Sequence, residues 1–133
     1  MSAAPRALGT YEVTVEAAAA AALAAALGRR GPEGPVPLTY PLIWLAAPAV
    51  RLALQAELAG EGALALPVHI EQRIALSAPL VIGAAYRLVL TLDGPDARRI
   101  LRLDGTLHDS AGQEVGTLRT GLALVALPQG AGA

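Results

Sequence analysis

Apolar residues dominate one central stretch of the chain, Pro35–Gly60, whereas most of the chain after it alternates between apolar and polar positions. From Leu42 onwards the apolar residues of PVPLTYPLIWLAAPAVRLALQAELAG cover nearly every face of a helix for about five turns. This pattern predicts one long central helix over about residues 41–59, buried on all sides, with Pro41 in its first turn. Pro48 is expected to bend this helix or to break its hydrogen bonds locally.

Alternation with a period of two predicts five strands. The first is Thr10–Val15 (TYEVTV), and the other four follow the central helix. The alanine-rich run Glu16–Leu27 predicts a short helix between the first strand and the central helix, because alanine is the best helix former. The four later strands are predicted at Pro67–Ser77, Tyr86–Asp93, Arg98–His108 and Glu114–Leu127.

The order of these elements indicates an α+β protein. A strand, a short helix, a long helix and four antiparallel strands fit the hot-dog fold, in which a curved antiparallel sheet of about five strands wraps around one long central helix. A generic α+β sandwich of the same elements is the alternative. We expect a single domain over residues 10–127, a flexible N-terminus over residues 1–9 and a disordered tail over residues 128–133.

Composition excludes several classes of function. The chain has 133 residues, 54% of them hydrophobic, and a formal net charge of −1, so a nucleic-acid partner is not expected. It has no cysteine, its histidines His69 and His108 lie far apart, and its glycines form no phosphate-binding motif. We therefore expect no metal and no cofactor. The apolar run Leu42–Leu58 is interrupted by proline and charge and is too short to span a membrane, and no basic segment precedes the alanine run, which favours the cytoplasm.

The predicted strand Pro67–Ser77 carries a titratable group suited to proton transfer near neutral pH, the imidazole of His69. Strict alternation places His69, Glu71 and Arg73 on one face of this strand, as a charged network within a subunit or across a dimer contact. The opposite face would hold Val68, Ile70, Gln72, Ile74 and Leu76.

Four segments in order resemble the MaoC-like acyl dehydratases and (R)-specific enoyl-CoA hydratases, in particular the N-terminal-half type of this family. They are TYEVTVEAAAAAALAAALG, PVPLTYP, LPVHIEQRIALSAPLVIGAAYRLVLTL and DSAGQEVGTLRTGLALV, within roughly Tyr11–Val125. The resemblance implies a hot-dog fold and the hydration or dehydration of acyl thioesters carried by coenzyme A or an acyl carrier protein. It also implies a homodimer or higher oligomer in which the strand bearing His69 lies at the sheet edge and pairs with its copy.

The chain departs from this family where the long helix begins. Active members carry an Asp and a His five residues apart, with Asn-Pro between them, and the matching stretch GPEGPVPLTYP contains no Asp, His or Asn. Glu33 is the only carboxylate nearby. Because the reaction needs an acid and a base, the sequence leaves His69 and Tyr40 as weak catalytic candidates. The alternative is a non-catalytic hot-dog subunit that partners a catalytic one.

Three residues at the start of the long helix are candidates for substrate binding: Thr39, Tyr40 and Trp44. The hydroxyl groups could bind a thioester or cap the helix, and the indole could line an acyl pocket or pack in the core. Arg98, Arg99 and Arg102 could bind coenzyme A phosphates or be solvated. A hot-dog acyl-CoA thioesterase is a further alternative, and Glu57 is then the carboxylate on the long helix.

Overall fold

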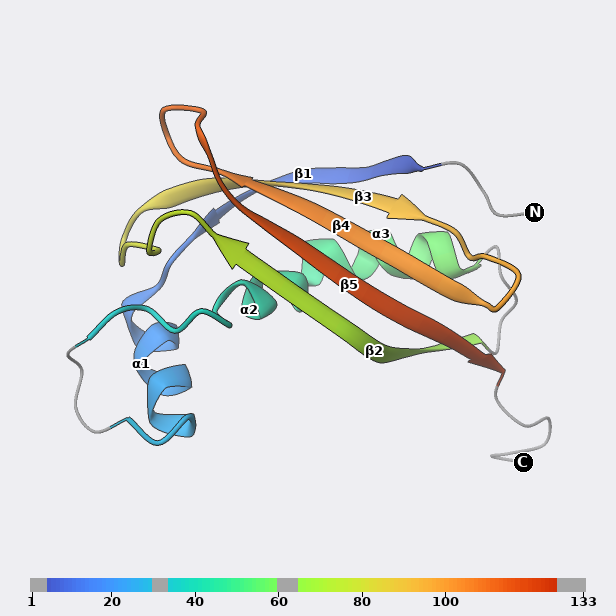
Figure 1. The fold of residues 1–133 in the computed structure, drawn as a ribbon, viewed down its shortest axis with the longest axis horizontal. Helices are drawn as coiled ribbons and strands as arrows, with labels where there is room; N and C mark the ends of the chain where they lie inside the picture. Colours follow the sequence, from blue (N-terminus) through green and yellow to red (C-terminus); the bar gives the residue numbers. More distant parts are fainter. Residues whose placement is uncertain (1–4, 30–33, 60–64, 127–133) are drawn as a thin grey trace.

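The computed structural model describes residues 5–29, 34–59 and 65–126. Five strands form a single antiparallel sheet in the order β1-β3-β4-β5-β2 (Figure 1). The strands are β1 (Arg6–Thr14), β2 (Ala65–Leu76), β3 (Ala85–Asp93), β4 (Ile100–His108) and β5 (Glu114–Ala126). This sheet confirms the predicted number of strands and their antiparallel arrangement. It also makes β1 and β2 the two edge strands.

The strand β1 begins at Arg6 rather than at Thr10. The expected loose N-terminus over residues 1–9 is therefore too long, since residues 6–9 pair with β3. Residues 1–4 and the expected tail over residues 128–133 lie outside the described residues. The sequence signal is weak here because RALG does not alternate, and the pairing shifts register by one residue between Ala7 and Gly9.

The central helix is broken into two pieces, α2 (Pro41–Leu45) and α3 (Pro48–Leu58). Ala47 has extended backbone angles (φ −62°, ψ 147°), because a residue that precedes a proline avoids the helical region. Pro48 then occupies the first turn of α3, where its missing N–H breaks no bond. The expected break at Pro48 is confirmed. No helix among the described residues is long and apolar enough to cross a membrane.

The expectation that the central helix is buried on all sides is wrong for α3. Val50 and Leu58 are buried, but Leu52 is 66% exposed. Figure 1 shows α3 partly behind β4, with β1 and β3 above it in the view and the first half of β2 clear of it. The helix thus covers one side of the sheet incompletely. The side of α3 that points away from the sheet carries exposed apolar residues such as Leu52. The other helix, α1 (Ala17–Ala26), buries Ala20 and Ala24.

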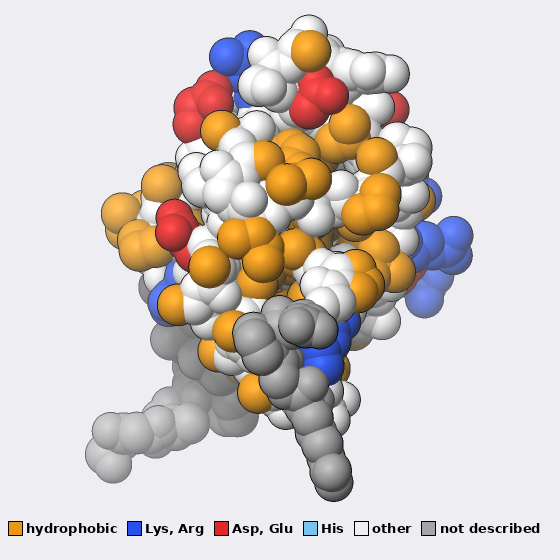
Figure 2. Space-filling view, turned by 90° about the vertical axis from the view of Figure 1, so that its left-hand side faces the viewer, with side chains coloured by type: hydrophobic (Ala, Val, Ile, Leu, Met, Phe, Trp, Pro, Cys, Tyr) orange, Lys and Arg blue, Asp and Glu red, His pale blue; other side chains and the backbone are white. Residues whose placement is uncertain are grey.

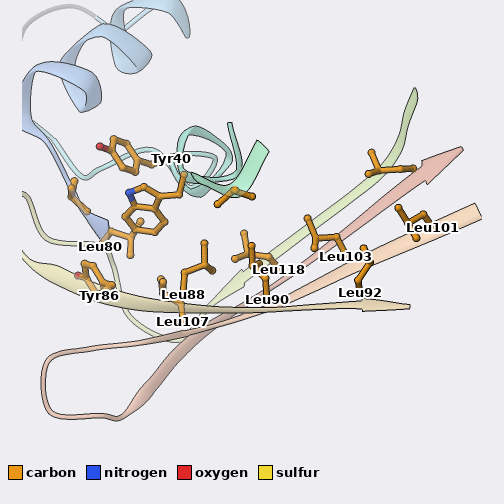
Figure 3. Packing of buried hydrophobic residues seen from close by; sticks show 14 of the residues in the cluster. Tyr40, Leu80, Tyr86, Leu88, Leu90, Leu92, Leu101, Leu103, Leu107 and Leu118 are labelled. Atoms are coloured by element: carbon orange, nitrogen blue, oxygen red, sulfur yellow. The ribbon is translucent and has the colours of Figure 1, made fainter. Parts of the chain in front are cut away.

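The core lies between the sheet and the two central helices. Leucine side chains of β3, β4 and β5 point from the sheet toward α2 and α3 (Figure 3). We call this side of the sheet the helix-facing side and the opposite one the outer face. The buried leucines on the helix-facing side are Leu88, Leu90, Leu92, Leu101, Leu103, Leu107, Leu118, Leu122 and Leu124.

The three arginines considered for coenzyme A phosphates lie in or next to the connection between β3 and β4: Arg98 and Arg99 belong to the connection, and Arg102 belongs to β4. The Asp96 carboxylate accepts hydrogen bonds from the backbone N–H groups of Ile100 and Arg98, both at 2.9 Å. The bond from Ile100 is the main reason that the pKa of Asp96 is lowered, and the nearby Arg98 and Arg102 also lower it. Arg98 and Arg102 therefore lie near a carboxylate that already balances part of their charge.

Candidate functional site

Three aromatic rings meet where α2 begins. The ring centroids of Tyr40 and Trp44 lie 5.4 Å apart in an edge-to-face arrangement, and those of Trp44 and Tyr86 lie 6.0 Å apart. Tyr40 is 1% exposed and Trp44 is 5% exposed. Tyr40 and Trp44, two of the substrate-binding candidates, thus lie together inside the core. Tyr86 of β3 completes the group, and the sequence pattern gave it no role.

The polar atoms of these rings are committed to the backbone. The Tyr40 hydroxyl accepts a hydrogen bond of 2.9 Å from the N–H of Glu16, the residue just before α1. The Trp44 indole N–H donates to the carbonyl of Thr14 at the end of β1, at 3.2 Å. The Tyr40 hydroxyl therefore satisfies a backbone N–H at the start of α1 instead of capping its own helix. Thr39 is exposed and does not cap α2 through its side chain.

Exchange of Tyr40 for phenylalanine tests this structural role. Because the change leaves the N–H of Glu16 without its acceptor, we expect a loss of about 1 kcal/mol in the free energy of unfolding, measured with urea. The affinity for any acyl-CoA ligand should stay the same. The matched control is Tyr11→Phe, at a half-buried tyrosine of β1. A Tyr40→Phe protein of unchanged stability but weakened ligand binding would show that the hydroxyl contacts the ligand instead.

The backbone N–H groups at the start of α2 are also in use. The N–H of Leu42 bonds to the carbonyl of Thr39 at 3.0 Å, and the N–H of Ile43 bonds to that of Tyr40 at 2.9 Å. Donors of this kind commonly polarise a carbonyl when they are free. In this chain they close the turns of a five-residue helix. The start of α2 therefore supplies neither an acid–base pair nor these two donors.

An apolar hollow of about 250 Å³ lies beside the start of α2. Its lining includes Val36, Leu38, Leu76, Pro79 and Leu80, with Ser77 as its hydroxyl group. Apolar side chains spread over this end of the molecule (Figure 2), and Val81 and Ile82 in the loop after β2 are exposed. The hollow is apolar and wide open to solvent.

A β-bulge in β2 changes the predicted faces of this strand. His69 lies opposite Leu122, and Glu71 lies opposite the next residue, Gly121, so Ile70 is the extra residue. Directly opposed residues of an antiparallel pair share a face, and Leu122 is a core residue. His69 therefore belongs to the helix-facing side. Its side chain is nevertheless exposed, because this half of the edge strand lies clear of α3.

Strict alternation predicts that Glu71 and Arg73 lie on the same face of β2 as His69. Because of the bulge, they lie on the opposite face. A Cβ atom built on Gly121 would lie 3.2 Å from Glu71 Cβ and 3.5 Å from Ile70 Cγ1, so both side chains lie on the outer face. Glu71 pairs there with Arg73, at 2.8 Å. The expected network of His69 with Glu71 and Arg73 is therefore wrong within the subunit, because the extra residue reverses the alternation between them.

Two polar residues that the sequence pattern did not single out lie on the helix-facing side next to His69. The Thr120 hydroxyl donates a hydrogen bond of 2.8 Å to the side-chain oxygen of Gln72, and Thr120 is 4% exposed. Strict alternation placed Gln72 with apolar residues, where it would have been an isolated polar exception. Its pairing with a polar residue on β5 requires knowledge of strand order and register. No sequence pattern within β2 provides that knowledge.

The other charged candidates from the sequence are placed away from His69, Gln72 and Thr120. Glu57 near the end of α3 forms an ion pair of 3.1 Å with Arg6 of β1. His108 lies on the outer face of β4, opposite Arg87 of β3. Glu33 falls outside the described residues. Among the residues that the structure describes, no group of three or more His, Cys, Asp or Glu side chains is placed to bind a metal ion. His69 is also far from the start of α2. Leu76 lines the hollow beside the start of α2, and about 23 Å of extended strand separates His69 from Leu76.

Comparison with solved structures identifies the architecture. The chain is similar to the 3R-hydroxyacyl-ACP dehydratase complex HadBC from Mycobacterium tuberculosis, with a TM-score of 0.63, 15% identity and coverage of 90% of this chain and 96% of that chain. It is also similar to the fluoroacetyl-CoA-specific thioesterase FlK, with a TM-score of 0.67, 13% identity and coverage of 94% of this chain and 96% of that chain. For the (R)-hydratase from A. caviae involved in PHA biosynthesis, the TM-score is 0.57 and the identity 16%, with coverage of 92% of this chain and 97% of that chain.

These similarities show the fold. The protein has a hot-dog fold, as the order of its predicted elements indicated. No protein-family model matches the sequence, and a search of curated proteins finds no significant match.

Proposed function

We propose that this chain is a MaoC-like hot-dog protein of the cytoplasm that binds acyl thioesters of coenzyme A or an acyl carrier protein and hydrates or dehydrates them. The observation that carries the proposal is the placement of His69 on the helix-facing side of a hot-dog sheet. An imidazole there can act as the base and the acid toward a bound acyl group. Solved structures of similar fold include a dehydratase and a hydratase.

The test separates binding from turnover. The purified chain is titrated with butyryl-CoA in a calorimeter, and its hydration of crotonyl-CoA is followed by loss of absorbance of the conjugated double bond. Binding with turnover is the expected result, and the free thiol of coenzyme A alone should bind more weakly because it lacks the acyl group. A chain that binds no acyl-CoA and leaves crotonyl-CoA unchanged would refute the proposal.

A non-catalytic hot-dog subunit is the second candidate, and a specific observation favours it. The side chains of Tyr40 and Trp44, at the start of α2, hold α1 and β1 in place through their hydrogen bonds. A chain with this role would bind acyl-CoA alone and yield turnover only in a heteromer with a catalytic hot-dog partner. The HadBC dehydratase is described as a complex. Hydration assays with and without co-purified partner chains distinguish this candidate from the first.

A thioesterase is the weaker alternative. The carboxylate of Glu57, the acidic side chain on α3, is held by Arg6, whose guanidinium also donates to the carbonyl of Gly94 at 3.0 Å. This arrangement ties the end of α3 to the sheet. Release of thiol from butyryl-CoA, with loss of that activity in Glu57→Gln, would support the thioesterase against the hydratase.

We also propose that β2 pairs with β2 of a second copy to form a dimer or higher oligomer. As an edge strand, β2 has one side without a neighbouring strand in the described sheet. Next to this edge, four large apolar side chains are exposed on the outer face of β2 and β5, which is more than a scatter of single residues. They are Leu66, Val68, Ile70 and Val125.

Replacement of Val68 by glutamate is expected to shift the protein toward monomer, because the carboxylate would have to be buried against the second copy. Sedimentation velocity at micromolar concentration measures this shift. The control is Val81→Glu, at an exposed valine in the loop after β2, which should leave the oligomer intact. A wild-type protein that sediments only as a monomer contradicts the proposal.

A further inference from the structure

Three polar side chains occupy consecutive positions on the helix-facing side at one edge of the sheet. His69 and Gln72 belong to β2, and Thr120 lies opposite Gln72 on β5. Their neighbours on this side are the buried leucines Leu118 and Leu122. Thr120 is buried and Gln72 is half-buried, and their mutual hydrogen bond pairs them, whereas the His69 side chain is exposed.

The hydrogen bond from Thr120 determines which donors Gln72 offers. The Thr120 hydroxyl donates to the carboxamide oxygen of Gln72 at 2.8 Å, so the carboxamide nitrogen carries the donors that remain. That nitrogen reaches the carbonyl of Arg73 only at 3.5 Å, which is the long limit of a hydrogen bond. Gln72 therefore offers an oriented N–H donor to a ligand oxygen.

A thioester reaction needs such a donor. Removal of the proton at C2 places negative charge on the thioester oxygen, and preorganised N–H groups stabilise that charge. The N–H groups of Leu42 and Ile43 at the start of α2 are already bonded to carbonyl groups of the preceding turn. Another part of the chain can supply the stabilising donor, and the half-buried carboxamide of Gln72, next to Leu118 and Leu122, is in a position to do so.

The spacing of His69 and Gln72 suits this chemistry. The two residues flank the bulge and follow one another on the same face of β2, so their Cα atoms are about 7 Å apart. The thioester oxygen and C2 are separated by a single carbon atom. Side chains that converge from two such positions can contact the oxygen and the C2 proton of one substrate molecule.

We infer that Gln72, oriented by Thr120, binds the thioester oxygen of a 3-hydroxyacyl or 2-enoyl substrate while His69 transfers the proton; this inference rests on the proposed function. In dehydration, the neutral imidazole of His69 takes the proton from C2, and the charge of the resulting enolate lies on the oxygen bound by Gln72. The C3–O bond then breaks as the imidazolium returns this proton to the departing hydroxyl. The products are the 2-enoyl thioester and water, and hydration is the reverse.

The test compares the purified wild-type assembly with three single variants and one double variant. Gln72→Leu should lower kcat for crotonyl-CoA hydration by about 100- to 1,000-fold, because it deletes the donor to the enolate oxygen. Thr120→Val should give a smaller fall in kcat, and adding it to Gln72→Leu should cause no further loss, since Thr120 acts through Gln72. His69→Ala should lower kcat by about 100- to 10,000-fold, because it removes the group that transfers the proton.

Binding and stability measurements separate this inference from the function on which it rests. The affinity for butyryl-CoA, which does not react, should change less than about threefold in Gln72→Leu, since the stabilised charge exists only during reaction. The control Gln113→Leu, at an exposed glutamine before β5, should keep full kcat, and thermal melts check that each variant is folded.

Each outcome bears on a defined part of the inference. An active wild type whose kcat survives Gln72→Leu overturns the role of Gln72 and leaves the hydratase intact. A wild type that binds butyryl-CoA but hydrates nothing overturns the whole catalytic inference and favours the non-catalytic subunit. A wild type that binds no acyl-CoA refutes the proposed function itself.

Discussion

Replacement of Trp44 by alanine is expected to lower the free energy of unfolding by about 3 to 5 kcal/mol. The indole is 5% exposed, lies between the rings of Tyr40 and Tyr86, and holds the end of β1 through the carbonyl of Thr14. The change creates a cavity and removes that donor. A domain of ordinary size is stable by only about 5 to 15 kcal/mol, so a large fraction of the molecules could unfold.

Urea denaturation followed by circular dichroism measures this loss. The matched control is Leu52→Ala on α3, where the side chain is 66% exposed and the expected change is within about 0.5 kcal/mol. A Trp44→Ala protein as stable as the control would mean that the indole lines a solvent-filled acyl site instead of the core. The prediction therefore also decides between the two roles that the sequence left open for Trp44.

Exchange of Gly94 for alanine is the second prediction of large effect. Gly94 has φ +99°, and a Cβ atom there would lie 2.7 Å from the carbonyl oxygen of Ile100. The substitution therefore combines unfavourable backbone angles with a clash against backbone that cannot rotate away. We expect a loss of about 3 kcal/mol or more.

Gly112 provides the control for this prediction because it has φ +84° but no atom within 4 Å of the position that an added Cβ would take. Gly112→Ala should cost only the backbone term of about 1 to 2 kcal/mol. The difference between the two variants in thermal or urea unfolding then isolates the steric contribution. Equal losses would show that the connection between β3 and β4 adjusts to the extra methyl group.

Local signals were sufficient for the order of elements. The change from alternation to all-round apolarity predicts where strands give way to the central helix, and a proline in that helix predicts its break at Pro48. The partial exposure of α3 was not predictable in this way. Whether Leu52 contacts protein or solvent depends on what lies across from α3, and the sequence of the helix holds no information on that.

The site was predicted less well because its geometry depends on pairing between distant strands. Tyr40 and Trp44 both lie at the start of the central helix, but their hydrogen bonds reach Glu16 and Thr14, more than twenty residues away in the sequence. The helix-facing position of His69 depends on a bulge, and no residue type marks that bulge, since Ile70 is an ordinary strand residue. Pairing of Gln72 with Thr120 follows from the same register.

The bulge at Ile70 also bears on how this edge strand can gain or lose a residue during evolution. Loss of this one codon would leave His69 opposite Leu122 and Glu71 opposite Gly121, now in regular alternation. His69 would stay on the helix-facing side, and Val68 would stay on the outer face. A residue can thus be inserted or deleted at this point while the side chains before and after it keep their faces. Chains of this fold are therefore best aligned by strand register, because a count of residues along β2 alone would assign His69 to the wrong face.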